Sequence, residues 1–201
     1  MDAEGTMTHL FWMTAVQVVL SIKYGHVLLY DDTAVKNKYR LPVGIGAVID
    51  GEYFTRIAFQ MIASDTQSET FEWMMEAWKE ARGAEPDVFI QDADSACTLA
   101  AEKVFPGATK LRCQWHLWKN VKEKLTSVLN GDYPAFADGF HKMRGRLSET
   151  GFEESFEELC DKFPKAEKYL RHLYKDRRRW AAAFSVLTFS VSSFTSSRVE
   201  G

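Results

Sequence analysis

The stretch from Asp87 to Leu125 constrains the fold of this chain more than any other. It reads DVFIQDADSACTLAAEKVFPGATKLRCQWHLWKNVKEKL. The apolar run Val88 to Ile90 predicts a short buried strand, and this strand ends just before the acid Asp92. Helical spacing of apolar residues begins at Ser95, a Pro-Gly pair ends it, and Lys110 to Cys113 predicts a second strand. Because ligands gather at the carboxyl ends of strands in open α/β sheets, Asp92 is a candidate site residue.

The residues before this stretch predict further strands of the same sheet. Val27 to Tyr30 is an apolar run that ends in two acids, and Val43 to Ile49 is a second run, closed by an Asp-Gly hairpin signal. The alternating segment Ile57 to Ala63 follows, so three consecutive antiparallel strands are expected. The helical pattern from Thr66 to Arg82 then crosses back, which places the Val88 strand parallel to the first strand. The sequence therefore predicts an α/β fold with a mixed sheet.

The sequence also predicts the places of two helices. The apolar stretch Leu10 to Ile22 lacks preceding basic residues and is too short to span a bilayer, so we expect a buried helix there and no membrane partner. Thr66 and Glu69 have the spacing of a capping box, which predicts a helix that begins at Thr66.

Beyond His116 the pattern becomes entirely helical. Stripes of large apolar residues recur at helical spacing from Leu117 to Leu187, and turn signals such as Asn130-Gly131 and Pro164 separate them. We therefore expect a helical block attached to the sheet.

The composition sets limits on partners and compartment. The formal net charge is −3, so overall charge does not indicate a nucleic-acid-binding protein, and DNA contacts would need locally concentrated basic residues. The three cysteines, at 97, 113 and 160, form no pattern of disulfides and fit a reducing compartment.

Asp31 and Asp92 are the strongest candidates for metal ligands. Each follows an apolar strand, and if the two strands are adjacent and parallel, the two carboxylates share one end of the sheet. Carboxylate oxygens there suit Mg²⁺ or Mn²⁺, and a pair of ions would support phosphoryl transfer. The alternative is structural, since acids often end strands and begin turns. Asp94 is also placed to cap the helix that begins at Ser95.

Two other groups of residues have a weaker chemical signal. Cys113 and His116 have metal-like spacing, but no second close pair completes the four ligands that a structural zinc site needs, so we do not expect zinc. The basic run contains Arg177, Arg178 and Arg179, which are candidates for DNA-phosphate contacts, and Trp180, a candidate for base stacking. A solvated helix end is the alternative explanation of the run.

Several ordered motifs, taken together, resemble one known family. They are Asp31-Asp32-Thr33 with Asn37-Lys38-Tyr39 and Pro42, Phe71-Glu72-Trp73, Gln91-Asp92 with Ala96, Val104-Phe105-Pro106, and Cys113 with Trp115-His116 and Asn120. This combination is similar to the transposases of Mutator-like elements (MULE) and to their domesticated far-red-response relatives in plants. The resemblance extends from about Leu10 to Glu200.

The resemblance implies an RNase H-like DDE catalytic core that cleaves and transfers DNA strands with two Mg²⁺ or Mn²⁺ ions. By motif position, Asp31 and Asp92 are the first two catalytic acids and metal ligands, and Glu200 is the candidate third. Cys113 and His116 match a family signature near the site, and Arg177 with Trp180 resembles a recurrent Arg-x-x-Trp motif. Transposon ends and target DNA would be the partners, the location would be nuclear, and homo-oligomerisation stays open.

These expectations divide the chain into four parts. Residues 1–26 form a helical lead-in, 27–116 the catalytic core, 117–188 a helical insertion, and 189–201 an incomplete returning segment with Glu200. The sequence departs from the family at Ala34, where an aromatic is frequent, and at Gln91, where threonine is frequent. Two other functions stay open: an inactive domesticated copy that associates with DNA, and an RNase H-like nuclease unrelated to transposition.

Overall fold

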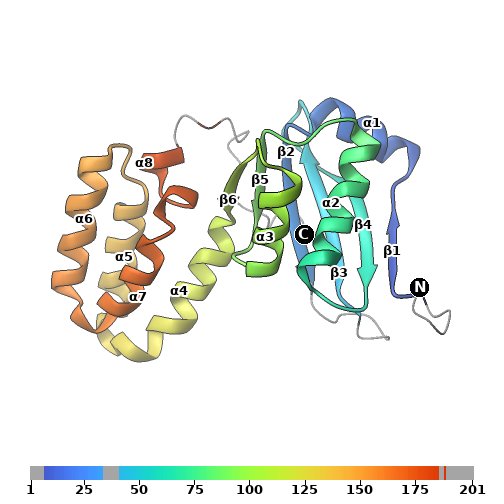
Figure 1. Ribbon diagram of the computed structural model, residues 1–201. Coiled ribbons are helices and arrows are strands. Elements are labelled where there is room, and N and C mark those ends of the chain that lie inside the picture. The colour runs from blue at the N-terminus through green and yellow to red at the C-terminus, as the bar shows by residue number, and fades with distance from the viewer. Residues whose placement is uncertain (1–6, 34–40, 186–187, 189–201) are drawn as a thin grey trace. The chain divides into compact units, whose positions relative to one another are not determined.

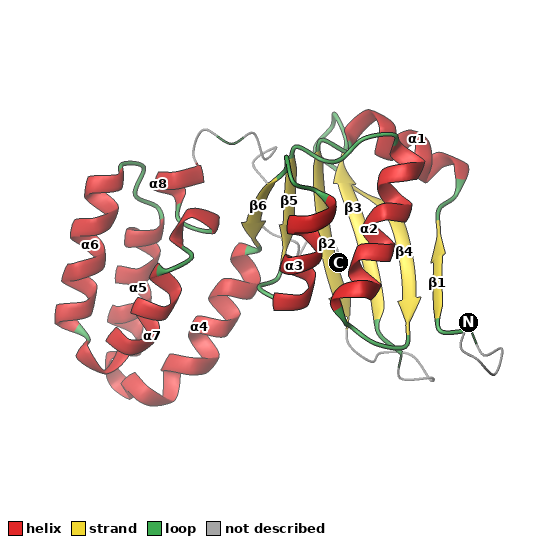
Figure 2. Cartoon of the chain, viewed as in Figure 1, coloured by secondary structure: helices red, strands yellow, loops and turns green. Residues whose placement is uncertain are grey.

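The computed structural model describes residues 7–33, 41–185 and 188. The chain divides into two compact units that meet in sequence between Cys113 and Gln114. The first unit contains a β-sheet with helices, and the described residues of the second are helical (Figure 2). The predicted α/β class, with a mixed sheet followed by a helical block, is confirmed.

The described residues of the first unit form a six-stranded sheet with the order β1-β4-β3-β2-β5-β6. The strands are β1 (His9–Trp12), β2 (Val27–Thr33), β3 (Val43–Ile49), β4 (Thr55–Ala63), β5 (Val88–Gln91) and β6 (Thr109–Arg112). The three strands β2, β3 and β4 are antiparallel, as predicted. The pairs β2–β5 and β5–β6 are parallel, which confirms the expected crossover.

Helices α2 (Ser68–Arg82) and α3 (Ser95–Val104) lie side by side on one face of the sheet (Figure 1). We call this face the helix-covered face. Its core contains buried aromatic side chains from three strands, Tyr30, Phe59 and Phe89. Since side chains alternate along a strand, the neighbouring residues point to the other side. There, on what we call the opposite face, Leu29, Ile90 and Leu111 are also buried.

The N-terminal apolar stretch does not form the single buried helix predicted for it. Residues His9–Trp12 form strand β1, which pairs with β4, and α1 begins only at Ala15 (Ala15–Tyr24). Thr14 caps α1 in a capping box with Gln17. The helix buries its polar residues Gln17 and Ser21 and exposes Val16, Val19 and Ile22.

The predicted capping box at Thr66 is also wrong. Helix α2 begins at Ser68, and the backbone N–H of Gln67 donates to the carboxylate of Asp65 at 3.1 Å. Asp65 therefore organises the start of the helix in place of Thr66. At the other end, Gly83 adopts a left-handed conformation (φ 84°) and terminates α2 as a C-cap.

The described part of the second unit packs around its own apolar core. Its helices are α4 (Gln114–Leu129), α5 (Tyr133–Arg144), α6 (Glu149–Lys162), α7 (Pro164–Tyr174) and α8 (Ala182–Ser185), with the 3-10 turns η1 (Asn130–Asp132) and η2 (Arg177–Arg179). Phe136, Phe140, Phe152 and Phe156 form the centre of this core and are fully buried. In the described ranges of both units, no helix has the length and apolar character needed to cross a bilayer.

Candidate functional site

Asp31 lies near the end of strand β2, and Asp92 directly follows the neighbouring parallel strand β5. The register pairs Leu29 of β2 with Ile90 of β5, an offset of 90 − 29 = 61 residues. Asp31 and Asp92 have the same offset, 92 − 31 = 61, and each lies two residues beyond the last registered pair. By strand alternation Asp31 shares the opposite face with Leu29. Asp92 follows the last residue of β5, so both acids lie at the same end of the two parallel strands.

Asp31 lies inside the sheet rather than in a turn. It belongs to β2 and pairs with Ile45 of the antiparallel strand β3. The residue is only 5% exposed, which is unusual for an aspartate. Its pairing with β3 and its burial fix the position of Asp31 within the sheet.

Asp92 lies in the turn between β5 and α3, and several hydrogen bonds hold this turn. The Asp92 carboxylate accepts from the backbone N–H of Ala93 at 2.6 Å. Asp94 is the N-cap of α3 and accepts from the backbone N–H of Cys97 at 2.8 Å, which confirms its predicted capping role. The side-chain amide of Gln91 donates to Thr98 of α3 at 2.8 Å.

The sequence marks Gln91 only as a position where the family frequently has threonine. In the structure it is buried and joins the end of β5 to α3 through Thr98. The residue therefore positions the turn that carries Asp92. A separation of seven residues does not predict a hydrogen bond between Gln91 and Thr98, because this contact depends on where the turn places α3.

Cys113 continues the same row across the sheet. The register pairs Gln91 with Arg112, an offset of 112 − 91 = 21, and Cys113 follows Asp92 by the same number, 113 − 92 = 21. The backbone N–H of Cys113 donates to the carbonyl of Gln91 at 2.8 Å. Cys113 is buried with Val27, Val88, Ile90 and Leu111. His116 lies in the first turn of α4, in the other compact unit, with its ring edge-on to Trp115.

Two buried groups near this end of the sheet have raised pKa values. Burial raises the pKa of Tyr30 well above its ordinary value, and Cys97, Asp32 and Asp31 raise it further. Burial likewise raises the pKa of the Cys97 thiol, with contributions from Asp32, Asp94 and Asp92. Both groups therefore remain neutral at pH 7.

The carboxylates of Asp31 and Asp92 are of the ligand type that hard divalent cations such as Mg²⁺ and Mn²⁺ prefer. Within the part of the chain that the structure describes, no group of three or more side chains could hold a metal ion. The predicted third acid, Glu200, lies outside the described residues.

The arginines of the basic run contact nearby groups of the helical unit. Arg177 forms an ion pair with Glu153 at 3.2 Å, and its guanidinium lies 3.9 Å from the centre of the Tyr174 ring. Arg179 pairs with Asp176 at 3.3 Å, whereas the guanidinium of Arg178 lies over Phe184 at 5.5 Å. These contacts order the segment, and its role toward DNA phosphates stays a prediction.

The predicted stacking role of Trp180 does not fit the structure. Trp180 is 2% exposed and packs against Phe140, with ring centres 6.1 Å apart and nearly parallel planes. Its indole N–H donates to the carbonyl of Leu173 at 3.0 Å. The ring faces belong to the core of the helical unit, so a nucleic-acid base has no access to them.

Comparison with known proteins identifies the region that contains Asp31, Asp92 and Cys113. Residues 27–120 match the MULE transposase domain. This region is a MULE transposase domain. It also includes His116, whereas the basic run and Glu200 lie beyond its matched boundary.

The chain that contains the MULE transposase domain is homologous to far-red-response proteins of Arabidopsis thaliana. It is 31% identical over 192 residues to Protein FAR1-RELATED SEQUENCE 5, covering 92% of this chain and 24% of that protein. It is 26% identical over 188 residues to Protein FAR1-RELATED SEQUENCE 2, covering 89% of this chain and 22% of that protein. Protein FAR-RED IMPAIRED RESPONSE 1 is 22% identical over 203 residues, covering 100% and 24%. The chain spans about a quarter of the length of these relatives.

Proposed function

We propose that the MULE transposase domain of this chain is an RNase H-like core of the DDE type, which cleaves and joins DNA by metal-dependent phosphoryl transfer. The observation that carries the proposal is that Asp31 and Asp92 lie at the same end of two neighbouring parallel strands, each two residues beyond the last registered pair. The arrangement of three antiparallel strands followed by two parallel ones supports the RNase H-like assignment.

In this mechanism the two aspartates would hold Mg²⁺ or Mn²⁺, and Glu200 is the proposed third ligand. Such ions, when bound, would supply activation of the attacking hydroxyl and stabilisation of the leaving oxygen. Asp31 supplies a carboxylate fixed by the sheet, and Gln91 with Asp94 orients the turn that carries Asp92. The proposal implies DNA ends and target DNA as partners and a nuclear location.

A second proposed function is DNA association without catalysis. The relatives are named for the far-red response and not for transposition. This observation favours a domesticated copy that retains the fold and associates with DNA without catalysis. Such a copy could keep Asp31 and Asp92 because the sheet tolerates them, while it lacks a complete metal site.

The first test is binding of Mg²⁺ and Mn²⁺, measured by titration calorimetry on the chain and on its Asp31→Asn and Asp92→Asn variants. Each substitution removes one anionic ligand, so we expect each to weaken binding by at least about tenfold. Asp87→Asn is the matched control, because Asp87 directly precedes β5 and thus lies at the opposite end of the strand from Asp92. Binding that neither active-site substitution changes would contradict the proposal.

The two functions are separated by a cleavage assay on the full-length protein. The enzyme predicts Mn²⁺-dependent nicking of DNA that Asp92→Asn abolishes while the circular dichroism spectrum is preserved. The domesticated copy predicts DNA association that the same substitution leaves unchanged, with no nicking by either protein. Nicking that persists in Asp92→Asn would remove this residue from the catalytic site.

A further inference from the structure

Within the described part of the chain, strand β1 has no neighbouring strand on the side away from β4. The backbone N–H of Ser64 donates to the carbonyl of Thr8 at 2.9 Å, so Thr8 and Ser64 are a hydrogen-bonded pair of the antiparallel ladder. By alternation, the backbone groups of Leu10 and Trp12 also face β4. Those of His9 and Phe11 therefore point outward from the sheet. In the sheet of described residues β1 is a terminal strand, as Figure 1 shows.

A small open pocket lies beside this edge on the helix-covered face. It has a volume of about 270 Å³ and is lined by His9, Glu69, Thr70 and Trp73. The rings of His9 and Trp73 meet edge-on, with centres 5.4 Å apart. Glu69 and Trp73 are four residues apart on α2, so they occupy neighbouring positions on one helix face. The pocket thus combines an aromatic ring with a carboxylate.

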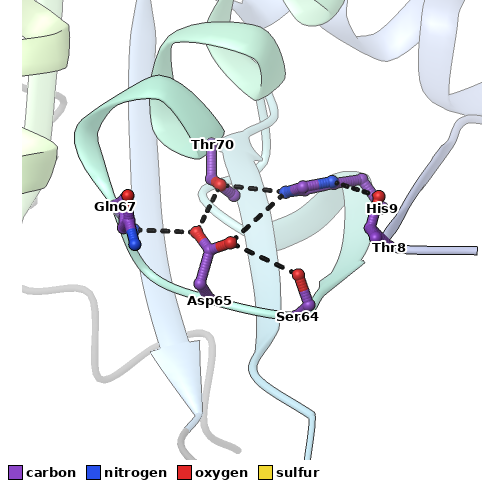
Figure 3. A network of polar contacts seen from close by, with 6 residues as sticks. All are labelled: Thr8, His9, Ser64, Asp65, Gln67 and Thr70. Carbon is purple, nitrogen blue, oxygen red and sulfur yellow. Dashed lines mark hydrogen bonds and ion pairs between the residues drawn. The ribbon is translucent and has the colours of Figure 1, made fainter. Parts of the chain in front are cut away.

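A hydrogen-bond network fixes the wall of the pocket that His9 forms (Figure 3). The hydroxyl of Thr70 donates to Asp65 at 2.6 Å, so Thr70 Oγ1 must accept from Nε2–H of His9, 2.9 Å away. Nδ1 of His9 lies 2.9 Å from the hydroxyl of Thr8. Both ring nitrogens are therefore occupied, and His9 shapes the pocket without offering a group to a ligand.

The groups that do face a ligand are suited to a cation. Trp73 is 38% exposed, and an indole ring attracts a Lys or Arg side chain. Glu69 is exposed and takes part in no ion pair among the described residues. The carboxylate of Asp65 lies 4.0 Å from His9 and adds negative charge beside the pocket. An anionic or purely apolar ligand would not match this set.

The other side of β1 suits an added strand as well. Leu10 and Trp12 are partly exposed on the opposite face, beside Ile62 and Gln60 of β4. A strand added to β1 would alternate its side chains, with one set near the pocket and the other near Leu10 and Trp12. Backbone bonds to His9 and Phe11 would fix its register.

We propose that β1 and the pocket of His9, Glu69, Thr70 and Trp73 bind an extended segment of a partner protein that places a Lys or Arg side chain against Trp73 and Glu69. A second copy of this chain fits less well, because β1 reads His-Leu-Phe-Trp and brings no Lys or Arg to the pocket. The site is separate from Asp31 and Asp92 and does not depend on metal binding.

The test uses a synthetic peptide, acetyl-Thr-Val-Arg-Val-Thr-amide, in an NMR titration of the chain. We expect shifts of the Trp73 indole N–H and of the backbone amides of His9 and Phe11. The peptide with Gln in place of Arg should bind about fivefold more weakly, since it loses the ion pair and the cation–π contact. A peptide methylated at alternate backbone nitrogens should not bind, because it cannot extend the sheet.

Two matched substitutions on α2 test whether the Arg peptide binds at this pocket. Glu69→Gln should weaken binding of the Arg peptide about fivefold, whereas Glu76→Gln, the same change on the same helix outside the pocket, should change it less than twofold. Absence of binding at about 1 mM peptide would overturn the proposal. So would equal binding by the Glu69→Gln variant, or a self-association through β1 that the Arg peptide does not displace.

Discussion

At the scale of single residues, Gly46 lies where the sheet allows no side chain. A Cβ atom at this position would meet the ring of Phe59 at 2.0 Å, and Phe59 is fully buried on the helix-covered face. The neighbouring register shift, from Gly46–Phe59 to Ala47–Ile57, leaves Ala58 unpaired as a β-bulge. The close approach of β3 to Phe59 therefore depends on glycine.

Gly46→Ala is predicted to lower the free energy of unfolding by about 1–3 kcal/mol, because Phe59 must leave its packed position. Gly51→Ala is the control, since its Cβ would meet only the Tyr24 ring at 3.7 Å or more. Urea unfolding of both variants measures the difference. Equal stabilities would show that β3 can move away from Phe59 at little cost.

Asp65 is predicted to make stability depend on pH. Hydrogen bonds from Thr70 and from the backbone of Gln67 lower its pKa below the ordinary 3.8. Because the folded-state pKa is the lower one, the stabilisation is complete above pH 3.8 and is lost as the pH falls through the folded-state value. Asp65→Ala should therefore cost about 1 kcal/mol at neutral pH and less in acid.

Urea unfolding of Asp65→Ala and of the wild type at neutral pH and at about pH 2.5 tests this dependence. Asp138→Ala, which removes an exposed carboxylate paired with Lys142, should change stability by less than about 0.5 kcal/mol. A cost of Asp65→Ala that is the same at both pH values would contradict the assignment.

At the scale of elements, helix α1 is inverted relative to an ordinary surface helix. Its polar residue Ser21 is fully buried and accepts a hydrogen bond from the indole N–H of Trp78 at 3.1 Å. The apolar residues Val16 and Ile22 are 68% and 55% exposed. The contact between α1 and α2 thus includes a buried polar pair, beside the hydrogen bond that Arg82 donates to the Ser21 carbonyl at 3.1 Å.

Ser21→Ala is predicted to cost about 1–3 kcal/mol, because the buried indole N–H of Trp78 loses its acceptor. A double-mutant cycle with Trp78→Phe isolates the bond: the Ser21 substitution should cost clearly less when no indole N–H is present. Chemical unfolding of the four proteins gives the coupling. Strict additivity of the two substitutions would show that the hydrogen bond contributes nothing.

One capping box that forms and one that does not form explain why the element boundaries were predicted only in part. Thr14 and Gln17 form a capping box that divides the N-terminal apolar stretch into strand and helix. The prediction of one continuous helix followed the apolar residues around Thr14 and overlooked this box. Thr66 and Glu69 have equally suitable spacing, yet Asp65 binds the backbone at the start of α2 instead. Local spacing alone cannot decide which of two competing acceptors captures the helix N-terminus.

At the scale of the whole molecule, the two compact units have separate apolar cores. The described core of the first unit includes Phe89, and that of the second includes Phe140. The sequence indicated both cores correctly, because apolar periodicity depends only on local spacing. The burial of Trp180 was not predictable in this way, since it depends on how helices distant in sequence enclose the ring.

Because each unit has its own apolar core, we predict that each unit has its own free energy of unfolding. Phe140→Ala should lower hydrogen-exchange protection of buried amides in the helical unit by about 3–5 kcal/mol and leave those of β2 and β5 almost unchanged. Phe89→Ala should do the reverse. Mass spectrometry of exchanged peptides distinguishes the two patterns. A uniform loss of protection across both units in either variant would show that they unfold as one cooperative structure.

The different settings of Asp31 and Asp92 have a consequence for any process that changes the distance between them. Asp31 lies within β2 and pairs with Ile45 of β3, whereas Asp92 follows the last residue of β5. In the proposed mechanism, the Asp31 carboxylate would therefore be the ligand with the fixed position. Any adjustment to a bound ion would come from the β5–α3 turn, on the Asp92 side of the site alone.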